Sequence, residues 1–127
     1  MTIEIKIPEK QALLDHEKLT VYQTAIEFVI LADEVIEHLP RGRAYLSDQL
    51  QRAALSIPLN IAEGAGEYAI DEKARFYRMA KRSATECAGV LDVRQRLRLV
   101  EEGRYMKGRE LLIGIVSMLI KMAQKNR

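Results

Sequence analysis

Polar side chains recur at helical spacing between residues 56 and 63. Ser56, Asn60 and Glu63 fall on one stripe, because steps of four and three residues return to the same face of an α-helix. We expect this stripe to be partly shut off from water, where a polar group without a hydrogen bond costs about 1–3 kcal/mol. Two apolar lines flank it, formed by Ile57 with Ile61 and by Leu55 with Leu59 and Ala62.

A second polar stripe lies downstream, between residues 71 and 100. Arg75, Arg82 and Glu86 recur there at near-helical spacing, with Ser83 beside them. We interpret both stripes as one structural network that fixes helix register or joins subunits, in which Arg75 and Arg82 hold Glu63 and Glu86. A ligand site and a nucleic-acid site are the alternatives. The complete predicted set is Gln49, Arg52, Ser56, Asn60, Glu63, Arg75, Arg82, Ser83 and Glu86.

The residue types needed for catalysis do not come together in this pattern. Ser56 or Cys87 would need a nearby base to act as a nucleophile, and neither histidine falls in a motif with them. A hydrolase using Glu63 and Glu86 is disfavoured, because arginines are expected to hold both carboxylates. We therefore predict no catalytic residues and a protein that is not an enzyme.

One cluster has the residue types of a metal site, namely Asp33, Glu34, Glu37 and His38. Glu34 and His38 are four residues apart, on a stripe that we expect to be exposed. Di-iron bundles use Glu-x-x-His pairs that face inward, and the chain contains no Glu-x-x-His. The prediction is that no metal and no cofactor is bound.

Charge is distributed unevenly along the chain. Residues 1–40 hold three Lys or Arg against eight Asp or Glu, and the remainder holds seventeen against ten. One dense basic set lies where two helices are expected to end and begin. It is either a pair of solvated helix ends or a surface that binds phosphate groups of RNA or DNA. Its members are Arg94, Arg96, Arg98, Arg104, Lys107 and Arg109.

Length and composition favour one domain in a reducing compartment. A chain of 127 residues with 48% hydrophobic residues is long enough to bury its own core. Its single cysteine cannot form an internal disulfide, and its few aromatic residues argue against a stacking platform for single-stranded nucleic acid. No signal-peptide core and no apolar run of about 18 residues is found. We expect a soluble, cytoplasmic protein that does not bind membranes.

Periodicity and glycine positions predict four helices, over about 17–39, 44–63, 71–102 and 105–124. Short connections make neighbouring helices antiparallel. The fold prediction is an all-α, up-down four-helix bundle over 17–127, preceded by an extended N-terminal arm over 1–16. Pro58 is expected to kink the second helix rather than break it at Ile57, because the apolar spacing continues in phase across it.

The first helix carries more apolar residues than one seam requires. The predicted seam follows alternating steps of three and four residues, and the surplus suggests a contact between subunits. The seam is Tyr22, Ala25, Val29, Ala32, Ile36 and Leu39, and the surplus is Val21, Phe28, Ile30, Leu31 and Val35.

The run from Gln49 to Gly66, followed by Arg75-Phe-Tyr and by Ala80 to Glu86, resembles a family of small bacterial four-helix bundles encoded in intervening sequences of 23S ribosomal RNA genes. The resemblance spans about 18–123, with departures at Glu67, where the family pattern has a basic residue, and at Arg82, where it has glycine. It implies a bundle that assembles into a ring of five and is related in fold to the accessory protein of diversity-generating retroelements. It implies no known catalytic activity.

The functional hypothesis is a non-enzymatic homo-oligomer that acts as a scaffold or a nucleic-acid-associated accessory protein. Its expected partners are further copies of itself, as a homopentamer, and RNA or DNA through phosphate contacts. The alternative is a protein–protein interaction module without a nucleic-acid role, which uses the surface of the first helix.

Overall fold

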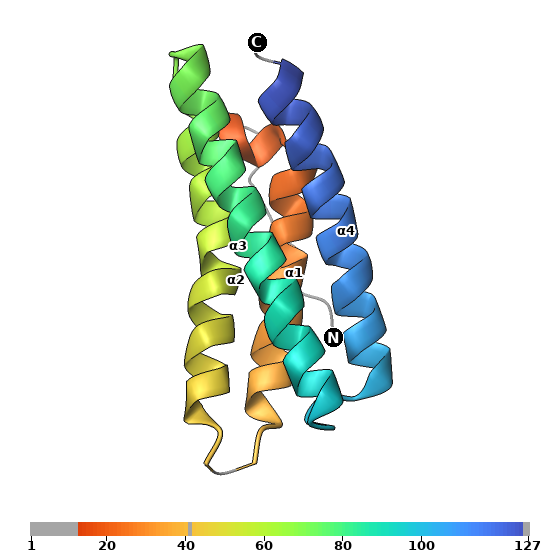
Figure 1. Ribbon diagram of the computed structural model, residues 1–127. Coiled ribbons are helices and arrows are strands. Elements are labelled where there is room, and N and C mark those ends of the chain that lie inside the picture. Colours follow the sequence, from red (N-terminus) through yellow and green to blue (C-terminus); the bar gives the residue numbers. More distant parts are fainter. Residues whose placement is uncertain (1–12, 41, 126–127) are drawn as a thin grey trace.

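The computed structural model describes residues 13–40 and 42–125, so most of the predicted N-terminal arm lies outside the described residues. A short 3-10 turn, η1 (Asp15–Lys18), precedes four helices that run down, up, down and up in the view of Figure 1. They are α1 (Thr20–Glu37), α2 (Ala44–Ala65), α3 (Ile70–Arg96) and α4 (Glu102–Lys125). The predicted all-α four-helix bundle is confirmed.

Each helix packs against two neighbours, in the cyclic order α1, α2, α3, α4 and back to α1. The α2–α3 and α3–α4 pairs have the most extensive contacts. In this arrangement α1 and α3 lie diagonally opposite each other, and every helix occupies one corner of the bundle (Figure 1). None of the helices in the described part of the chain is both long and apolar enough to cross a membrane.

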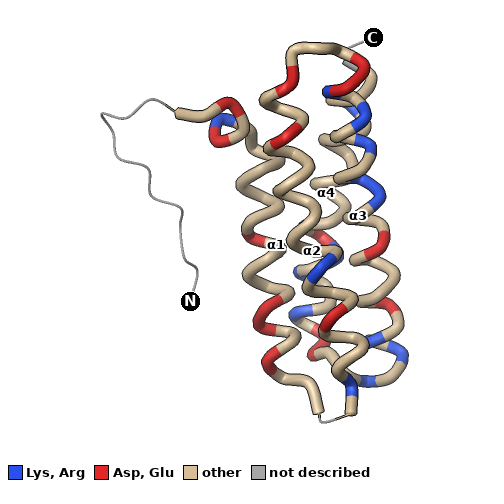
Figure 2. Tube along the Cα trace, turned by 90° about the vertical axis from the view of Figure 1, so that its left-hand side faces the viewer, with Lys and Arg blue, Asp and Glu red and all other residues tan. Residues whose placement is uncertain are grey.

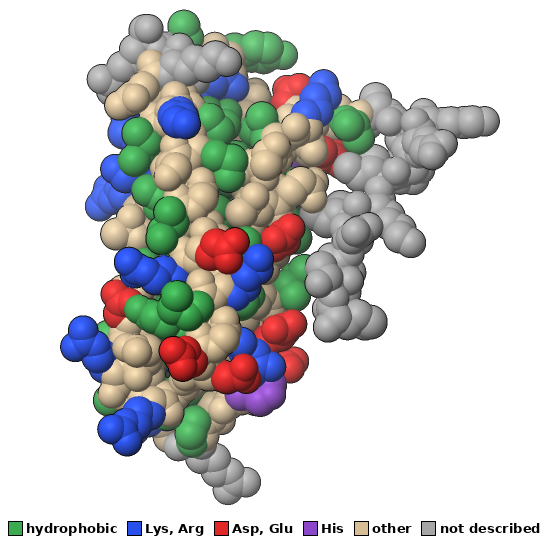
Figure 3. All heavy atoms as spheres, turned by 90° about the vertical axis from the view of Figure 1, so that its right-hand side faces the viewer, with side chains coloured by type: hydrophobic (Ala, Val, Ile, Leu, Met, Phe, Trp, Pro, Cys, Tyr) green, Lys and Arg blue, Asp and Glu red, His purple; other side chains and the backbone are tan. Residues whose placement is uncertain are grey.

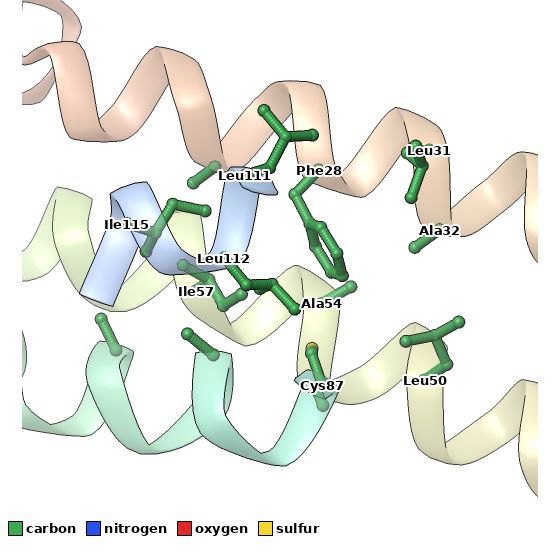
Figure 4. Close-up of a cluster of buried hydrophobic side chains, with 14 of the residues drawn as sticks. Phe28, Leu31, Ala32, Leu50, Ala54, Ile57, Cys87, Leu111, Leu112 and Ile115 are labelled. Carbon is green, nitrogen blue, oxygen red and sulfur yellow. The ribbon is translucent and has the colours of Figure 1, made fainter. Parts of the chain in front are cut away.

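The predicted seam of α1 is partly wrong. Ala25 and Ala32 are buried as expected, but the four larger seam residues are only partly buried. The core is instead made by Val21, Phe28, Leu31 and Val35, which the sequence placed in the surplus. The spacing of α1 allows two apolar stripes. Both contain Ala25 and Ala32, and their larger residues differ by one sequence position. Packing against the other helices buries the stripe that contains Phe28. Figure 4 shows the Phe28 ring pointing from α1 into the bundle centre.

The helix α2 continues through Pro58, as the apolar phase predicted, and Pro58 itself is buried. Leu55 and Leu59, however, were expected to be buried and are 50% and 54% exposed. They lie opposite the buried side of α2, which Ala54, Ile57 and Ile61 occupy. Only one side of a corner helix can face the core, so the second apolar line of α2 faces outward.

Close approach between α2 and α3 depends on a glycine. A Cβ atom at Gly64 would lie 2.8 Å from the Cε1 atom of the Tyr77 ring, which is closer than such atoms pack. Gly64 was predicted to end α2 but is a buried helical residue, and the helix continues to Ala65. Lys73 of α3 closes the end of α2, because its Nζ donates to the carbonyl oxygens of Gly64 at 2.8 Å and Ala65 at 3.1 Å.

The connection between α3 and α4 is longer than predicted. α3 ends at Arg96 rather than near 102, and α4 begins at Glu102 rather than at Tyr105. Arg98 reverses the chain with a backbone φ of 59°, in the left-handed region. At the other end, α3 begins at Ile70 with Ala69 as the N-cap, one residue earlier than predicted, and Asp71 lies in its first turn.

Candidate functional site

The predicted polar stripes of α2 and α3 meet along the seam between these helices. The hydroxyl oxygens of Ser56 and Ser83 are 2.8 Å apart, and Asn60 Nδ2 donates to Ser56 Oγ at 3.0 Å. Ser83 Oγ donates to the carbonyl oxygen of Met79 at 3.2 Å, which uses its single hydrogen. Ser56 must therefore donate to Ser83. The chain of donors runs in one direction, from Asn60 through Ser56 and Ser83 to the backbone of α3.

One further hydrogen bond extends this polar seam toward the other end of α2. Gln49 Nε2 donates to a carboxylate oxygen of Glu86. We define the α2–α3 seam as Gln49, Ser56, Asn60, Ser83 and Glu86. The residue numbers increase on α2 as they decrease on α3, so the seam holds the two antiparallel helices in one register. The role predicted for these residues, fixing helix register or joining subunits, stays a prediction.

The predicted arginine–carboxylate pairs do not form. Arg75 pairs with Glu72 one turn away, with Nη2 and Oε2 3.0 Å apart. This hydrogen bond raises the pKa of Arg75 and lowers the pKa of Glu72, while Glu63 affects the pKa of Arg75 only weakly. Glu86 is held by Gln49 rather than by Arg82. A long side chain on an exposed face pairs with the nearest carboxylate on its own helix, because that pairing restricts the two side chains less than pairing across two helices would.

A shallow hollow of about 250 Å³ lies over the centre of the seam. Its lining consists of Ser56, Asn60, Met79 and Ser83 together with the exposed residues Arg82 and Glu86. Arg52 and Glu63 are also exposed and make no ion pair within the described part of the chain. The predicted polar network is therefore a smaller hydrogen-bonded seam with charged side chains around it.

A second hollow, of about 210 Å³, lies between α3 and α4, and we call it the α3–α4 groove. Tyr105 and Asp92 are among its lining residues, and the Tyr105 hydroxyl donates to Asp92 Oδ1 at 2.7 Å. This hydrogen bond raises the pKa of Tyr105. The exposed residue Arg109 also lines this groove. The apolar part of the lining consists of Ala84, Ala88, Leu91, Leu112, Ile113 and Val116.

The predicted basic set is not one surface. Arg96, Arg98 and Arg109 are exposed and make no ion pair among the described residues. Arg104 lies 3.8 Å from Glu34 and 3.6 Å from Glu101, and Lys107 lies 4.0 Å from Glu110. These carboxylates reduce the local positive charge. Arg94, the remaining member, does not reach the surface.

Arg94 is fully buried in the bundle, which the sequence analysis did not anticipate. All three of its guanidinium nitrogens lack a hydrogen-bond partner among the described residues. Burial lowers its pKa. A signal for this position was present in the sequence, because Arg94 follows Tyr77, Ala84, Cys87 and Leu91 at core spacing on α3. The charge of Arg94 favoured a position on the surface, whereas its spacing from these core residues favoured a buried position.

The other candidate chemistries take simple structural positions. His38 Nδ1 lies 2.7 Å from the carbonyl oxygen of Glu34 on the same helix, and the Glu34 carboxylate faces Arg104. No cluster of three or more potential metal ligands is found in the ranges 13–40 and 42–125. Cys87 is buried in the core, and burial raises the pKa of its thiol to about 12.

The hydroxyl pair of the seam predicts a measurable coupling. Ser56→Ala and Ser83→Ala should each lower the free energy of unfolding by about 1 kcal/mol, because each leaves a partly buried polar group without its partner. Chemical denaturation of both single variants and the double variant should give a coupling of about 0.5–1.5 kcal/mol. Ser56→Ala combined with Ser117→Ala on α4 is the control and should be additive. Additivity of the seam pair would show that the two hydroxyls do not interact.

The buried guanidinium predicts a stabilising substitution. Arg94→Met keeps a long side chain and removes a desolvated charge, so it should raise the free energy of unfolding by about 1–4 kcal/mol, by analogy with the replacement of buried ion pairs. Arg96→Met, two residues away and exposed, should change it by no more than about 0.5 kcal/mol. A lower denaturation midpoint for Arg94→Met would mean that the guanidinium is stabilised in the native protein.

Comparison with known proteins identifies the family to which the chain is similar. The family model described as 23S rRNA-intervening sequence protein matches residues 17–121. This range includes all four helices apart from the last residues of α4. A search of curated proteins finds no match to the chain. The chain belongs to the family of 23S rRNA-intervening sequence proteins.

Proposed function

We propose that the protein is a non-enzymatic scaffold that works by self-association of its four-helix bundle. The observation that supports this most directly is a line of apolar side chains on the outer side of α4. Met106, Ile113 and Ile120 are 56%, 55% and 39% exposed. They are spaced seven residues apart, so they follow one another along the whole helix, and we call them the α4 stripe.

The α4 stripe is not needed for the fold of one bundle. The core side of α4 is already supplied by Leu111, Leu112, Ile115 and Leu119. The stripe also borders the α3–α4 groove, since Ile113 is part of both, so that exposed and recessed apolar surface adjoin. Exposed apolar side chains beside a recessed apolar groove are typical of an interface rather than of a monomer. The family resemblance in the sequence supports a ring of five copies.

Light scattering coupled to size exclusion tests this proposal. The native protein at micromolar concentration should elute as one species, with a mass that is a multiple of the 14.5 kDa chain and five times that mass for a pentamer. Ile113→Lys should reduce this mass, because it places a charge in the middle of the α4 stripe. A monodisperse native monomer would contradict the proposal, whereas a tetramer or hexamer would change only the number of copies.

Association with nucleic acid is a second candidate, supported by exposed arginines that are free of ion pairs. Arg96 and Arg98 lie at one end of the bundle, and Arg78 and Arg82 extend the positive charge along the outside of α3. Figure 2 shows Lys and Arg recurring along this helix. Such side chains would bind phosphates without reading sequence. The family description refers to 23S rRNA, which is compatible with an RNA partner but identifies no contact.

Fluorescence anisotropy with labelled RNA and DNA duplexes at two salt concentrations tests this candidate. Affinity should fall steeply as salt rises, and the double variant Arg96→Ser, Arg98→Asn should flatten that dependence by about two in the log–log slope. Asparagine is used at position 98 because it tolerates the left-handed backbone there. Arg52→Ser on α2 is the control. Absence of binding at low salt would rule out this candidate and would leave the scaffold proposal unaffected.

A further inference from the structure

We infer that the α3–α4 groove is a binding site for a small, neutral aromatic molecule that carries a hydroxyl group, such as a substituted phenol. The ring occupies the apolar part of the groove, and the hydroxyl group binds at a polar end formed by Asp92 and Arg109. The site is separate from the self-association proposed above, because Ile113 is the only member of the α4 stripe that lines the groove.

Small residues of α3 create the apolar part of the groove. Ala84 and Ala88 lie one turn apart on α3, and Leu112 and Val116 line the same hollow from α4. The methyl side chains are too short to fill the space between the two helices, so a hollow of about 210 Å³ remains. A ligand with an apolar surface is stabilised there, because it removes this lining from contact with water.

The volume of the groove selects a small ligand. An apolar cavity of about 150 Å³ is large enough to bind benzene, whereas pockets for drug-sized ligands hold about 300–1,000 Å³. The groove lies between these sizes and therefore fits one substituted ring or two fused rings. An aromatic ring is favoured over a flexible chain because it loses less conformational freedom on binding. It also attracts the guanidinium of Arg109, which lines the same hollow.

Three polar side chains come together at one end of the groove. The lining residues decrease in number along α3 as they increase along α4, which places Asp92 and Tyr105 at one end and Val116 and Ser117 at the other. The Tyr105 hydroxyl donates to Asp92 Oδ1 at 2.7 Å. This hydrogen bond raises the pKa of Tyr105, and the nearby positive charge of Arg109 opposes that rise. Arg109 therefore lies close to the pair.

A hydroxyl group matches this polar end because it both donates and accepts. Its hydrogen is donated to the Asp92 carboxylate, which has further acceptor sites besides the one that Tyr105 uses, and its oxygen accepts from Arg109. A carboxylate ligand would have no hydrogen to donate and would be repelled by Asp92. An ammonium ligand would have no acceptor and would be repelled by Arg109. The opposite charges of Asp92 and Arg109 therefore favour a neutral head group.

The groove is accessible from outside the bundle. Asp92 and Arg109 at the polar end are exposed, and so are Thr85 and Ser117 farther along. Figure 3 looks onto the side of the molecule on which α4 lies, where hydrophobic side chains reach the surface and Lys and Arg follow the left edge. A small ligand therefore enters from solvent without any separation of α3 from α4.

Fluorine NMR titration of the full-length protein at pH 7 tests the inference with 4-fluorophenol, which is neutral at this pH. The native protein should bind it with a dissociation constant of about 1 mM or lower, as expected for a ligand of this size. Fluorobenzene lacks the hydroxyl group, and 4-fluorobenzoate carries a negative charge in its place. Each should bind about fivefold or more weakly than 4-fluorophenol.

Variants locate the site. Ala88→Leu fills the groove and should weaken the binding of 4-fluorophenol and fluorobenzene by about tenfold or more. Gln95→Leu is the matched control, because it adds the same side chain at an exposed position of α3 outside the groove, and it should leave binding unchanged. Asp92→Ala should reduce the affinity for 4-fluorophenol to that for fluorobenzene and leave fluorobenzene binding unchanged. Circular dichroism checks that each variant remains helical.

Several outcomes would overturn the inference. A native protein that does not bind 4-fluorophenol, or a folded Ala88→Leu variant that binds it as well as the native protein does, would show that the groove is not the site. Equal affinity for 4-fluorophenol and fluorobenzene, or tighter binding of 4-fluorobenzoate, would contradict the neutral hydroxyl group. If Ala88→Leu does not fold, Asp92→Ala still tests the site, because Asp92 is exposed. Light scattering measures self-association independently of all these results.

Discussion

The close packing of α2 against α3 is the constraint on which the rest of the bundle depends. Gly64 allows the Tyr77 ring to approach the α2 backbone, and the small residue Ala80 is buried on α3 nearby. Because the helices are so close, the short side chains of Ser56 and Ser83 can reach each other. A register shift of one residue would break this hydrogen bond and drive Tyr77 into a side chain. The polar seam therefore specifies one alignment out of several that an apolar seam alone would allow.

This alignment also determines what is left for the outside. With α2 and α3 fixed, the small residues Ala84 and Ala88 face α4 over the α3–α4 groove, and the α4 stripe borders it. The outer faces then differ from corner to corner, since α1 is acidic and α3 is rich in arginine. A bundle with unlike faces can distinguish between partner surfaces, whereas one with uniform faces has no preferred partner surface. The packing of the core therefore determines which outer faces are available for specific contacts with a partner.

Among the described residues, Arg94 is the exception to the apolar interior of the bundle, because its charged side chain is fully buried. A guanidinium without partners among the described residues is held where an aliphatic side chain would fit, and its charge is disfavoured by burial. Arg94 lies near the C-terminal end of α3, shortly before the chain reverses at Arg98. At the same end of the bundle, the ion pair of Arg104 with Glu34 joins α4 to α1. Stability alone does not account for arginine at this position.

The sequence by itself determined the number of helices, their approximate bounds and the continuity of α2 through Pro58, because these depend on local periodicity and glycine punctuation. It also placed Ser56, Asn60, Ser83 and Glu86 on facing stripes, since short polar side chains in an apolar setting need partners close by. Only the tertiary structure decided which partner each long side chain takes: Arg75 turns to Glu72, and Gln49 rather than Arg82 reaches Glu86.

The same distinction between local spacing and tertiary packing explains the wrong predictions on α1, α2 and α3. The two overlapping stripes of α1 are equivalent by period, and the fit of Phe28 among the other helices chose between them. The outward position of Leu55 and Leu59, and the inward position of Arg94, depend on which direction each corner of the bundle faces. Spacing along one helix defines its stripes, but the stripe that becomes core is selected by the three other helices, because only together do they define an interior.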